Sequence, residues 1–288
     1  MSTEIQEATK SSVPAPVQDE KEMTFLEHLE ELRWHIVRSL LSILVFAVIA
    51  FLSKDIIFGQ IILGPSRAEF WTYRFFCSLS QAMGADFFCI DELPFIIQNR
   101  KMTAQFTLHL SSSFIVGLIM AFPYAFWEFW RFIKPGLYPR EKKVSRGAVF
   151  FVSLLFLTGI MFGYFIVSPI SINFLSHYQL DPSIQNEIDL TSYVGTLMML
   201  VLACGIMFQL PVVIFFLTKA GIVTPSFLKT YRKHAIVLIL VLSAIITPPD
   251  VISQILLSIP LILLYEISIW LSRIVHKQEQ EALSEALK

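Results

Sequence analysis

Apolar residues gather in six long stretches of the chain, with polar segments between them. The stretches cover approximately residues 35–53, 104–127, 147–169, 192–218, 234–247 and 251–272. Four of them approach the roughly 20 apolar residues that a helix needs to span a bilayer. The pattern therefore predicts an all-α integral membrane protein with six transmembrane helices.

The fifth stretch is the shortest of the six. Only residues 234–247 lie between Lys233 and Pro248. At about 1.5 Å per residue they make roughly 21 Å of helix, whereas the hydrocarbon core is about 30 Å thick. The turn at 247–250 then leads straight into the sixth stretch. We therefore predict that the fifth and sixth helices are short, and that this hairpin either fails to cross fully or thins the bilayer around it.

Basic residues are confined to particular segments between the stretches. Segment 128–146 carries six Lys or Arg residues and segment 219–233 carries four, whereas the turns 170–191 and 248–250 carry none. Short cytoplasmic loops are enriched in basic residues. The sequence therefore predicts that both termini are cytoplasmic and that the two basic segments are cytoplasmic loops.

These assignments divide the chain into three parts. Residues 23–273 form the six-helix membrane domain, whose long loop 54–103 lies on the outside. Residues 1–22 are polar and acidic, which favours a disordered cytoplasmic tail. Residues 274–288 form a cytoplasmic C-terminal tail.

Composition narrows the class of protein further. Hydrophobic residues make up 55% of the chain, with 26 Phe, and the mean hydropathy is +0.65, which excludes an ordinary soluble domain. The net charge of −1 provides no basic field for nucleic acid. The sequence has no nucleotide-binding glycine motif, no metal-ligand spacing of His or Cys and no catalytic Ser, His and Asp spacing. We therefore predict no enzymatic activity, no metal and no cofactor.

Two of the three cysteines, Cys77 and Cys89, fall in the predicted outside loop. Disulfides persist in oxidising compartments outside the cytoplasm. The sequence leaves two alternatives open, a disulfide or two free thiols. The third cysteine, Cys204, lies in the fourth stretch as a small membrane-buried residue.

An acidic amphipathic segment stands directly before the first apolar stretch. Thr24 and Glu27 fit a capping box that starts a helix, and apolar residues follow at three- and four-residue spacing. Glu30 and Glu31 lie beside that apolar face, where a helix on a membrane surface normally carries Lys or Arg. The segment therefore favours a cationic partner, and the alternative is a solvated helix face.

Five motifs occur in order along the chain and together resemble the TatC family. They are FLEHLEELR at 25–33, FIKPGLYPREK at 132–142, FGYFIVSP at 162–169, FQLPVV at 208–213 and TPPDVISQ at 247–254. The family is the polytopic component of the twin-arginine protein translocase. The resemblance implies binding of twin-arginine signal peptides on folded cargo, and export driven by the protonmotive force. It also implies TatA- and TatB-type single-helix partners, a homo-oligomer within a translocase complex, and a location in the bacterial cytoplasmic (inner) membrane.

The resemblance places the signal-peptide site at Glu31 and Glu141, with Arg33, Phe132 and Pro135 as supports. A carboxylate holds a guanidinium through two charge-assisted hydrogen bonds, so two adjacent Arg residues need two acceptors. The residues alone also fit a Glu141 that stabilises the first turn of a helix and a Glu31 that is solvated.

Four positions in or beside the later stretches carry further expectations. Gln209 stands where the family commonly has an acidic residue, so we expect a neutral group that docks a partner helix, or an amide satisfied within its own fold. Pro211 is expected to break the helix. Asp250 is expected to cap the sixth helix, as the acidic third residue after an N-cap at Thr247. Glu266 is either an intramembrane functional group or a residue paired near the cytoplasmic interface.

Gly159 and Gly163 form a G-x-x-x-G pattern in the third stretch. Small residues at this spacing let another helix approach closely. We expect packing within the chain in preference to a dimer interface.

The main rival prediction is a secondary transporter of small solutes. Such a protein would show an internal repeat and several ionisable residues facing a cavity at the midplane. No repeat of three stretches is evident, and the deep parts of the stretches hold mainly His109, Gln209 and Glu266. A membrane-protein insertase would need a buried cation, and none of the stretches has a central Lys or Arg.

Overall fold

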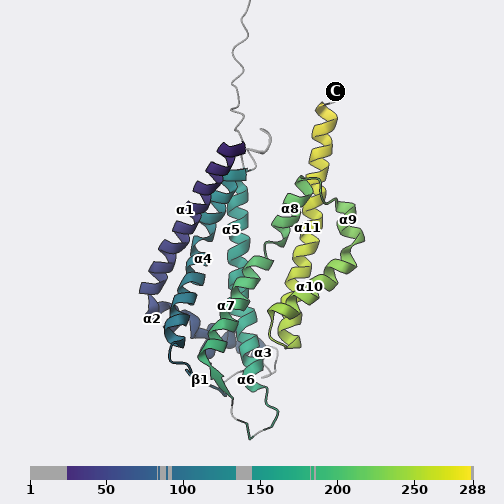
Figure 1. Cartoon of the computed structure of the whole chain (residues 1–288). Helices are drawn as coiled ribbons and strands as arrows, with labels where there is room; N and C mark the ends of the chain where they lie inside the picture. Colours follow the sequence, from purple (N-terminus) through teal and green to yellow (C-terminus); the bar gives the residue numbers. More distant parts are fainter. Residues whose placement is uncertain are drawn as a thin grey trace, which may run out of the picture.

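Helices account for most of the computed structural model, which describes residues 25–82, 84, 89, 93–133, 145–181, 183–184 and 186–286. The principal helices are α1 (Phe25–Leu52), α4 (Ala104–Ile133), α5 (Ser145–Phe162), η5 (Gly163–Val167), α6 (Ser168–His177), α7 (Leu190–Met207), α8 (Leu210–Lys219), α10 (Arg232–Ile246) and α11 (Val251–Ala286). They form an elongated bundle (Figure 1). The predicted tail 1–22 and Thr24 lie outside the described residues.

Within the described residues, five helical segments are long and apolar enough to cross a membrane. They are Glu30–Leu52, Ala104–Ile133, Gly147–His177, Leu190–Lys219 and Val251–Gln278. Helix α10 occupies the fifth predicted stretch but has only 15 residues, roughly 22 Å of helix. The predicted all-α membrane class is confirmed, and α10 is short as predicted.

The prediction of a short sixth helix is wrong, because α11 has 36 residues. The helix continues past the apolar stretch and through most of the predicted tail 274–288. Glu, Gln, Ala and Leu in this part are strong helix formers, and Lys277 pairs with Glu281 one turn later at 3.6 Å. The hydropathy pattern identified only the apolar part of α11, residues 251–272, whereas the helix continues into the polar residues that follow.

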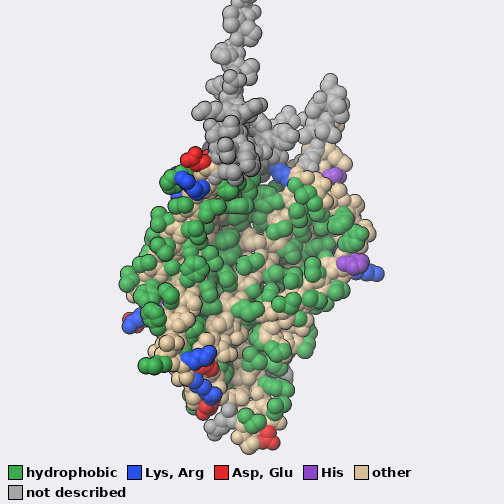
Figure 2. Space-filling view, viewed as in Figure 1, with side chains coloured by type: hydrophobic (Ala, Val, Ile, Leu, Met, Phe, Trp, Pro, Cys, Tyr) green, Lys and Arg blue, Asp and Glu red, His purple; other side chains and the backbone are tan. Residues whose placement is uncertain are grey.

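The described ends of the chain lie on the same side of the bundle. The start of α1 and the C-terminal end of α11 are both at the top of Figure 1. The lower end of the α10–α11 hairpin stops above the lower ends of α6 and α7 in the same view. On the face shown in Figure 2, hydrophobic side chains cover the middle of the molecule, and most charged side chains lie toward its upper and lower ends. This arrangement fits a bilayer around the middle of the bundle.

The segment between α1 and α4 is folded against the bundle. It contains α2 (Lys54–Ile56), η1 (Ile57–Ile62), η2 (Gly64–Ser66), α3 (Trp71–Ala82) and strand β1 (Ile96–Gln98). The Tyr73 hydroxyl donates to the carbonyl oxygens of Pro65 at 2.9 Å and Pro169 at 3.1 Å. Burial raises the pKa of Tyr73, so the hydroxyl remains a donor. Cys77 and Cys89 form a disulfide, the first of the two alternatives that the sequence leaves open.

A short pair of parallel strands joins two outer segments, which the sequence did not predict. Strand β1 pairs with β2 (Glu187–Asp189), and Ile97 lies opposite Ile188. An ion pair between Arg100 and Glu187 at 2.9 Å lies beside it. Three residues per strand are too few to produce a recognisable alternation of apolar and polar positions.

Glycines allow close approach of two helix pairs within the bundle. A Cβ atom on Gly117 of α4 would lie 2.5 Å from the Ala47 nitrogen of α1. A Cβ atom on Gly159 would lie 2.7 Å from the Cys204 carbonyl oxygen, and one on Gly163 would lie 2.9 Å from the Cys204 Cβ atom. The G-x-x-x-G pattern therefore packs within the chain, against α7.

We expect Gly159→Leu to lower the free energy of unfolding by about 1–3 kcal/mol, because the new side chain must displace the α7 backbone. Denaturant unfolding in detergent measures the change. Gly195→Leu is the matched control, since a Cβ atom at Gly195 meets nothing within 4 Å. Equal stability of the two variants would contradict close α5–α7 packing as the reason for Gly159.

Candidate functional site

The start of α1 and the end of α4, which the sequence predicts to be cytoplasmic, carry the described residues that the sequence placed in a signal-peptide site. Glu31 lies near the start of α1 and is partly exposed. Arg33 is exposed, with its guanidinium 5.4 Å from the centre of the Trp34 ring. Phe132 lies near the end of α4, and its ring meets the His35 ring edge-on at 6.2 Å. Glu141 and Pro135 lie outside the described residues.

A buried carboxylate joins these two helix ends. The Nδ1 atom of His35 on α1 lies 2.5 Å from Oε2 of Glu128 on α4. The Tyr124 hydroxyl, one turn earlier on α4, donates to Oε1 of Glu128 at 3.0 Å. His35 is 6% exposed and Glu128 is 1% exposed. A buried carboxylate is tolerated only when it is paired and hydrogen-bonded, so these contacts hold α1 to α4.

Two half-exposed arginines also approach the same carboxylate. A guanidinium nitrogen of Arg38 lies 4.0 Å from Oε2 of Glu128, and one of Arg131 lies 4.0 Å from Oε1. Arg131 also stacks on the Trp127 ring, 5.0 Å from its centre. Glu128 is thus fully engaged within the fold and is not free to bind an incoming guanidinium. Two carboxylates at the start of α1 remain accessible, Glu31, which is partly exposed, and Glu30, which is exposed.

Glu128 and His35 were not among the residues that the sequence motifs singled out. Glu128 was assigned to the start of the basic loop 128–146, but α4 continues to Ile133. The available signal was the aromatic run on either side of Glu128, which continues the apolar pattern beyond the single charge. His35 stands 93 residues away, so only tertiary packing brings the two together.

The other predicted polar positions all have contacts within the fold. Gln209 follows the end of α7, and its Nε2 donates to the Val152 carbonyl oxygen at 3.3 Å. Its Oε1 is buried with no hydrogen-bond partner among the described residues. Pro211 is buried in the first turn of α8, after the break between α7 and α8. Glu266 of α11 forms an ion pair with Arg232 at the start of α10.

Asp250 caps α11, but in a different position from the expected one. Its Oδ1 accepts from the Ser253 amide at 2.5 Å, so Asp250 is itself the N-cap residue. Thr247 ends α10, and its hydroxyl donates to the Ser243 carbonyl oxygen at 2.8 Å. The expected N-cap at Thr247 was wrong, because two prolines separate it from the first helical turn.

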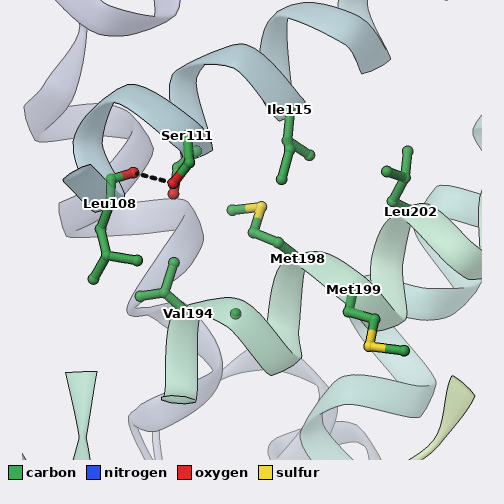
Figure 3. Close-up of a pocket in the computed structure, with 9 residues that line it drawn as sticks. Leu108, Ser111, Ile115, Val194, Met198, Met199 and Leu202 are labelled. Carbon is green, nitrogen blue, oxygen red and sulfur yellow. Dashed lines mark hydrogen bonds between the residues drawn. The ribbon is translucent and has the colours of Figure 1, made fainter. Parts of the chain in front are cut away.

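The deep polar side chains do not converge on a cavity. His109 Nε2 lies 2.9 Å from the Phe51 carbonyl oxygen, and the two rings stack at 4.0 Å. Gln209 and Glu266 have the separate partners given above. A pocket of about 200 Å³ lies between α4 and α7 (Figure 3), where the Ser111 hydroxyl donates to the Leu108 carbonyl oxygen. Its lining is apolar or hydroxyl-bearing, with no ionisable group.

Comparison with known proteins gives a consistent result. The family model described as Sec-independent protein translocase protein (TatC) matches residues 27–260. The Sec-independent protein translocase protein TatC of Blattabacterium sp. subsp. Periplaneta americana is 40% identical over 265 residues, 91% of this chain and 99% of that protein. TatCy of Bacillus subtilis is 32% identical over 262 residues, 91% of this chain and 93% of that protein.

The fold matches a solved structure as well. The crystal structure of a twin-arginine translocase receptor, TatC, superposes with a TM-score of 0.66 at 34% identity, covering 86% of this chain and 99% of that one. A second crystal structure of that receptor, in DDM, gives a TM-score of 0.67 at the same identity. These matches do not favour a small-solute transporter, and they show that the chain belongs to the TatC family of Sec-independent protein translocase proteins.

Proposed function

We propose that this protein binds the twin-arginine signal peptides of folded cargo at the cytoplasmic ends of α1 and α4. TatA- and TatB-type single-helix partners then join it to start export across the bacterial cytoplasmic membrane, driven by the protonmotive force. The observation that carries the proposal is the fixed geometry of these two helix ends, where His35 and Glu128 are paired and Glu31 remains partly exposed. The name of the matched crystal structure, a twin-arginine translocase receptor, supports it.

The chemistry of the site favours a guanidinium ligand. Glu31 makes no ion pair with any residue in the described part of the chain, so its carboxylate is available. Two adjacent Arg residues need two carboxylates, because each planar guanidinium binds one of them through paired hydrogen bonds. We assign the second carboxylate to Glu141, with Arg33, Phe132 and Pro135 as supporting residues.

The proposed binding site is tested by removing each carboxylate. We expect Glu31→Ala and Glu141→Ala each to weaken binding of an Arg-Arg signal peptide by roughly 30-fold, since a hydrogen-bonded charge contributes about 2 kcal/mol. The double variant should lose less than the sum, because both side chains hold one Arg-Arg element. Photo-crosslinking of the peptide to the reconstituted protein measures binding, and a Lys-Lys peptide sets the background.

Glu281→Ala, which removes the same charge from the C-terminal end of α11, is the matched control and should bind like the unmodified protein. Wild-type crosslinking in the double variant would overturn the assignment of the site.

Gln209 is proposed as the polar group that docks a partner helix. Its buried Oε1 accepts no hydrogen bond from the described residues, and an amide neither gains nor loses charge with pH. We expect Gln209→Leu to weaken association with a TatA- or TatB-type helix by about 1 kcal/mol. Gln209→Glu should be tolerated, because a protonated carboxyl also donates and accepts. Site-specific crosslinking from α8 measures the association, and unchanged crosslinking in the Leu variant would show that the amide only serves its own fold.

A further inference from the structure

An open groove lies between α1 and α4, just inside the cytoplasmic ends of both helices. It has a volume of about 360 Å³ and is lined by Arg38, Leu41, Ser42, Val45, Phe46 and Tyr124. Leu41 is 58% exposed and Val45 is 50% exposed. These apolar side chains lie on the outer surface of the bundle, so the groove faces the bilayer. Its walls are hydrocarbon apart from the Ser42 hydroxyl and the end where Arg38 and Tyr124 stand.

Positive charge at that end is only partly compensated. The side chains of Arg38 and Arg131 are each 49% exposed, and both approach the single buried carboxylate of Glu128 at 4.0 Å. Glu128 is already bonded to His35 and Tyr124. Two guanidinium groups share one carboxylate, so at least one positive charge at this end has no counter-charge from Glu128. The groove therefore joins an apolar slot to a positively charged end.

Aromatic side chains set the depth of this end in the membrane. Trp34 stands one turn before Arg38 on α1, and Trp127 stands one turn before Arg131 on α4. Trp34, Trp127 and Tyr124 are all exposed, by 40% or more. Exposed Trp and Tyr residues occupy the level of the lipid headgroups. The two guanidinium groups thus lie at headgroup level, with the apolar groove beneath them.

We propose that this groove binds an anionic phospholipid of the cytoplasmic leaflet. Arg38 and Arg131 hold the phosphate, and an acyl chain lies along Leu41, Val45 and Phe46. Basic pockets between transmembrane helices on the cytoplasmic side bind anionic headgroups. A partner helix fits less well, because interfaces between membrane helices use small residues, whereas large side chains and an arginine line this groove. The proposal does not depend on signal-peptide binding.

The experiment measures lipid binding to the purified full chain in detergent by native mass spectrometry. Phosphatidylglycerol and phosphatidylcholine with identical acyl chains are the probes. We expect roughly 25-fold tighter binding of phosphatidylglycerol, the product of two basic contacts of about fivefold each. The Arg38→Gln, Arg131→Gln double variant should lose this preference. Lys229→Gln removes one exposed charge from the short helix α9 (Pro225–Thr230), and this variant should keep the preference.

Two further measurements distinguish binding of the acyl chain in the groove from binding of the phosphate alone. Ser42→Leu fills the groove without changing charge, and it should weaken the binding of phosphatidylglycerol even if the double arginine variant does not fold. Glycerol 3-phosphate carries the phosphate without acyl chains, and it should not displace the lipid at equal concentration. Equal binding of the two lipids, an unchanged preference in the arginine or Ser42 variants, or displacement by glycerol 3-phosphate would each overturn the proposal.

Discussion

Replacing Glu128 with alanine is expected to lower the free energy of unfolding by about 3–5 kcal/mol, the cost of removing one partner from a buried charge pair. The change leaves the His35 ring and the Tyr124 hydroxyl without their hydrogen-bond partner. It also leaves Arg38 and Arg131 without a counter-charge. Glu128→Gln keeps acceptor and donor atoms in place, so it should cost only about 1 kcal/mol. Denaturant unfolding in detergent measures both variants.

Two controls make this expectation specific. Glu69→Ala, at an exposed position outside the spans, should stay within about 0.5 kcal/mol of the unmodified protein. A double-mutant cycle with His35→Ala should give a coupling energy of about 0.5–3 kcal/mol. Independent effects of the two substitutions would mean that the contact between α1 and α4 does not stabilise this end of the bundle.

Lengthening α10 by one turn is expected to leave the protein folded and to reduce export at least tenfold. The helix has 15 residues, and four further apolar residues after Leu240 add about 6 Å, which brings it close to the thickness of the hydrocarbon core. A full-length hairpin no longer requires the bilayer to thin around it. Export of a twin-arginine cargo, in cells whose own TatC is deleted, measures the effect.

The matched control inserts the same four residues after Gly84, where a Cβ atom at Gly84 itself would meet nothing within 4 Å. Its export should remain close to that of the unmodified protein. Full export by the lengthened α10 would remove any role for the short helix.

The spans could be predicted from the sequence because the bilayer imposes a simple rule on composition. A helix in lipid must be apolar over about 20 residues, so hydropathy located all five long spans and the short α10. Helix ends followed no such rule. Helix α4 continues past Glu128 to Ile133, and α11 continues to Ala286, because charged residues at a membrane surface are compatible with a helix.

The candidate site was predictable only in part, for a related reason. Motifs along the chain singled out Glu31, Arg33 and Phe132, which the structure places at neighbouring helix ends. Glu128 could not be recognised as buried from its neighbours in sequence, because its partner His35 lies 93 residues away on another helix. The β1–β2 pairing could not be predicted from the sequence either, because the paired residues Ile96 and Glu187 are 91 positions apart in the chain.

The native protein offers no accessible thiol to thiol-reactive probes, because of how its three cysteines are placed. Cys77 and Cys89 are bonded to each other, and Cys204 is fully buried against α5. A single cysteine at an exposed position beside the signal-peptide site, Gln209 or the groove, such as Glu30, Ile206 or Leu44, would therefore be the one reactive thiol under non-reducing conditions. Maleimide reporters can then follow signal-peptide binding, helix docking and lipid occupancy in an otherwise unaltered protein, with no need for a cysteine-free background.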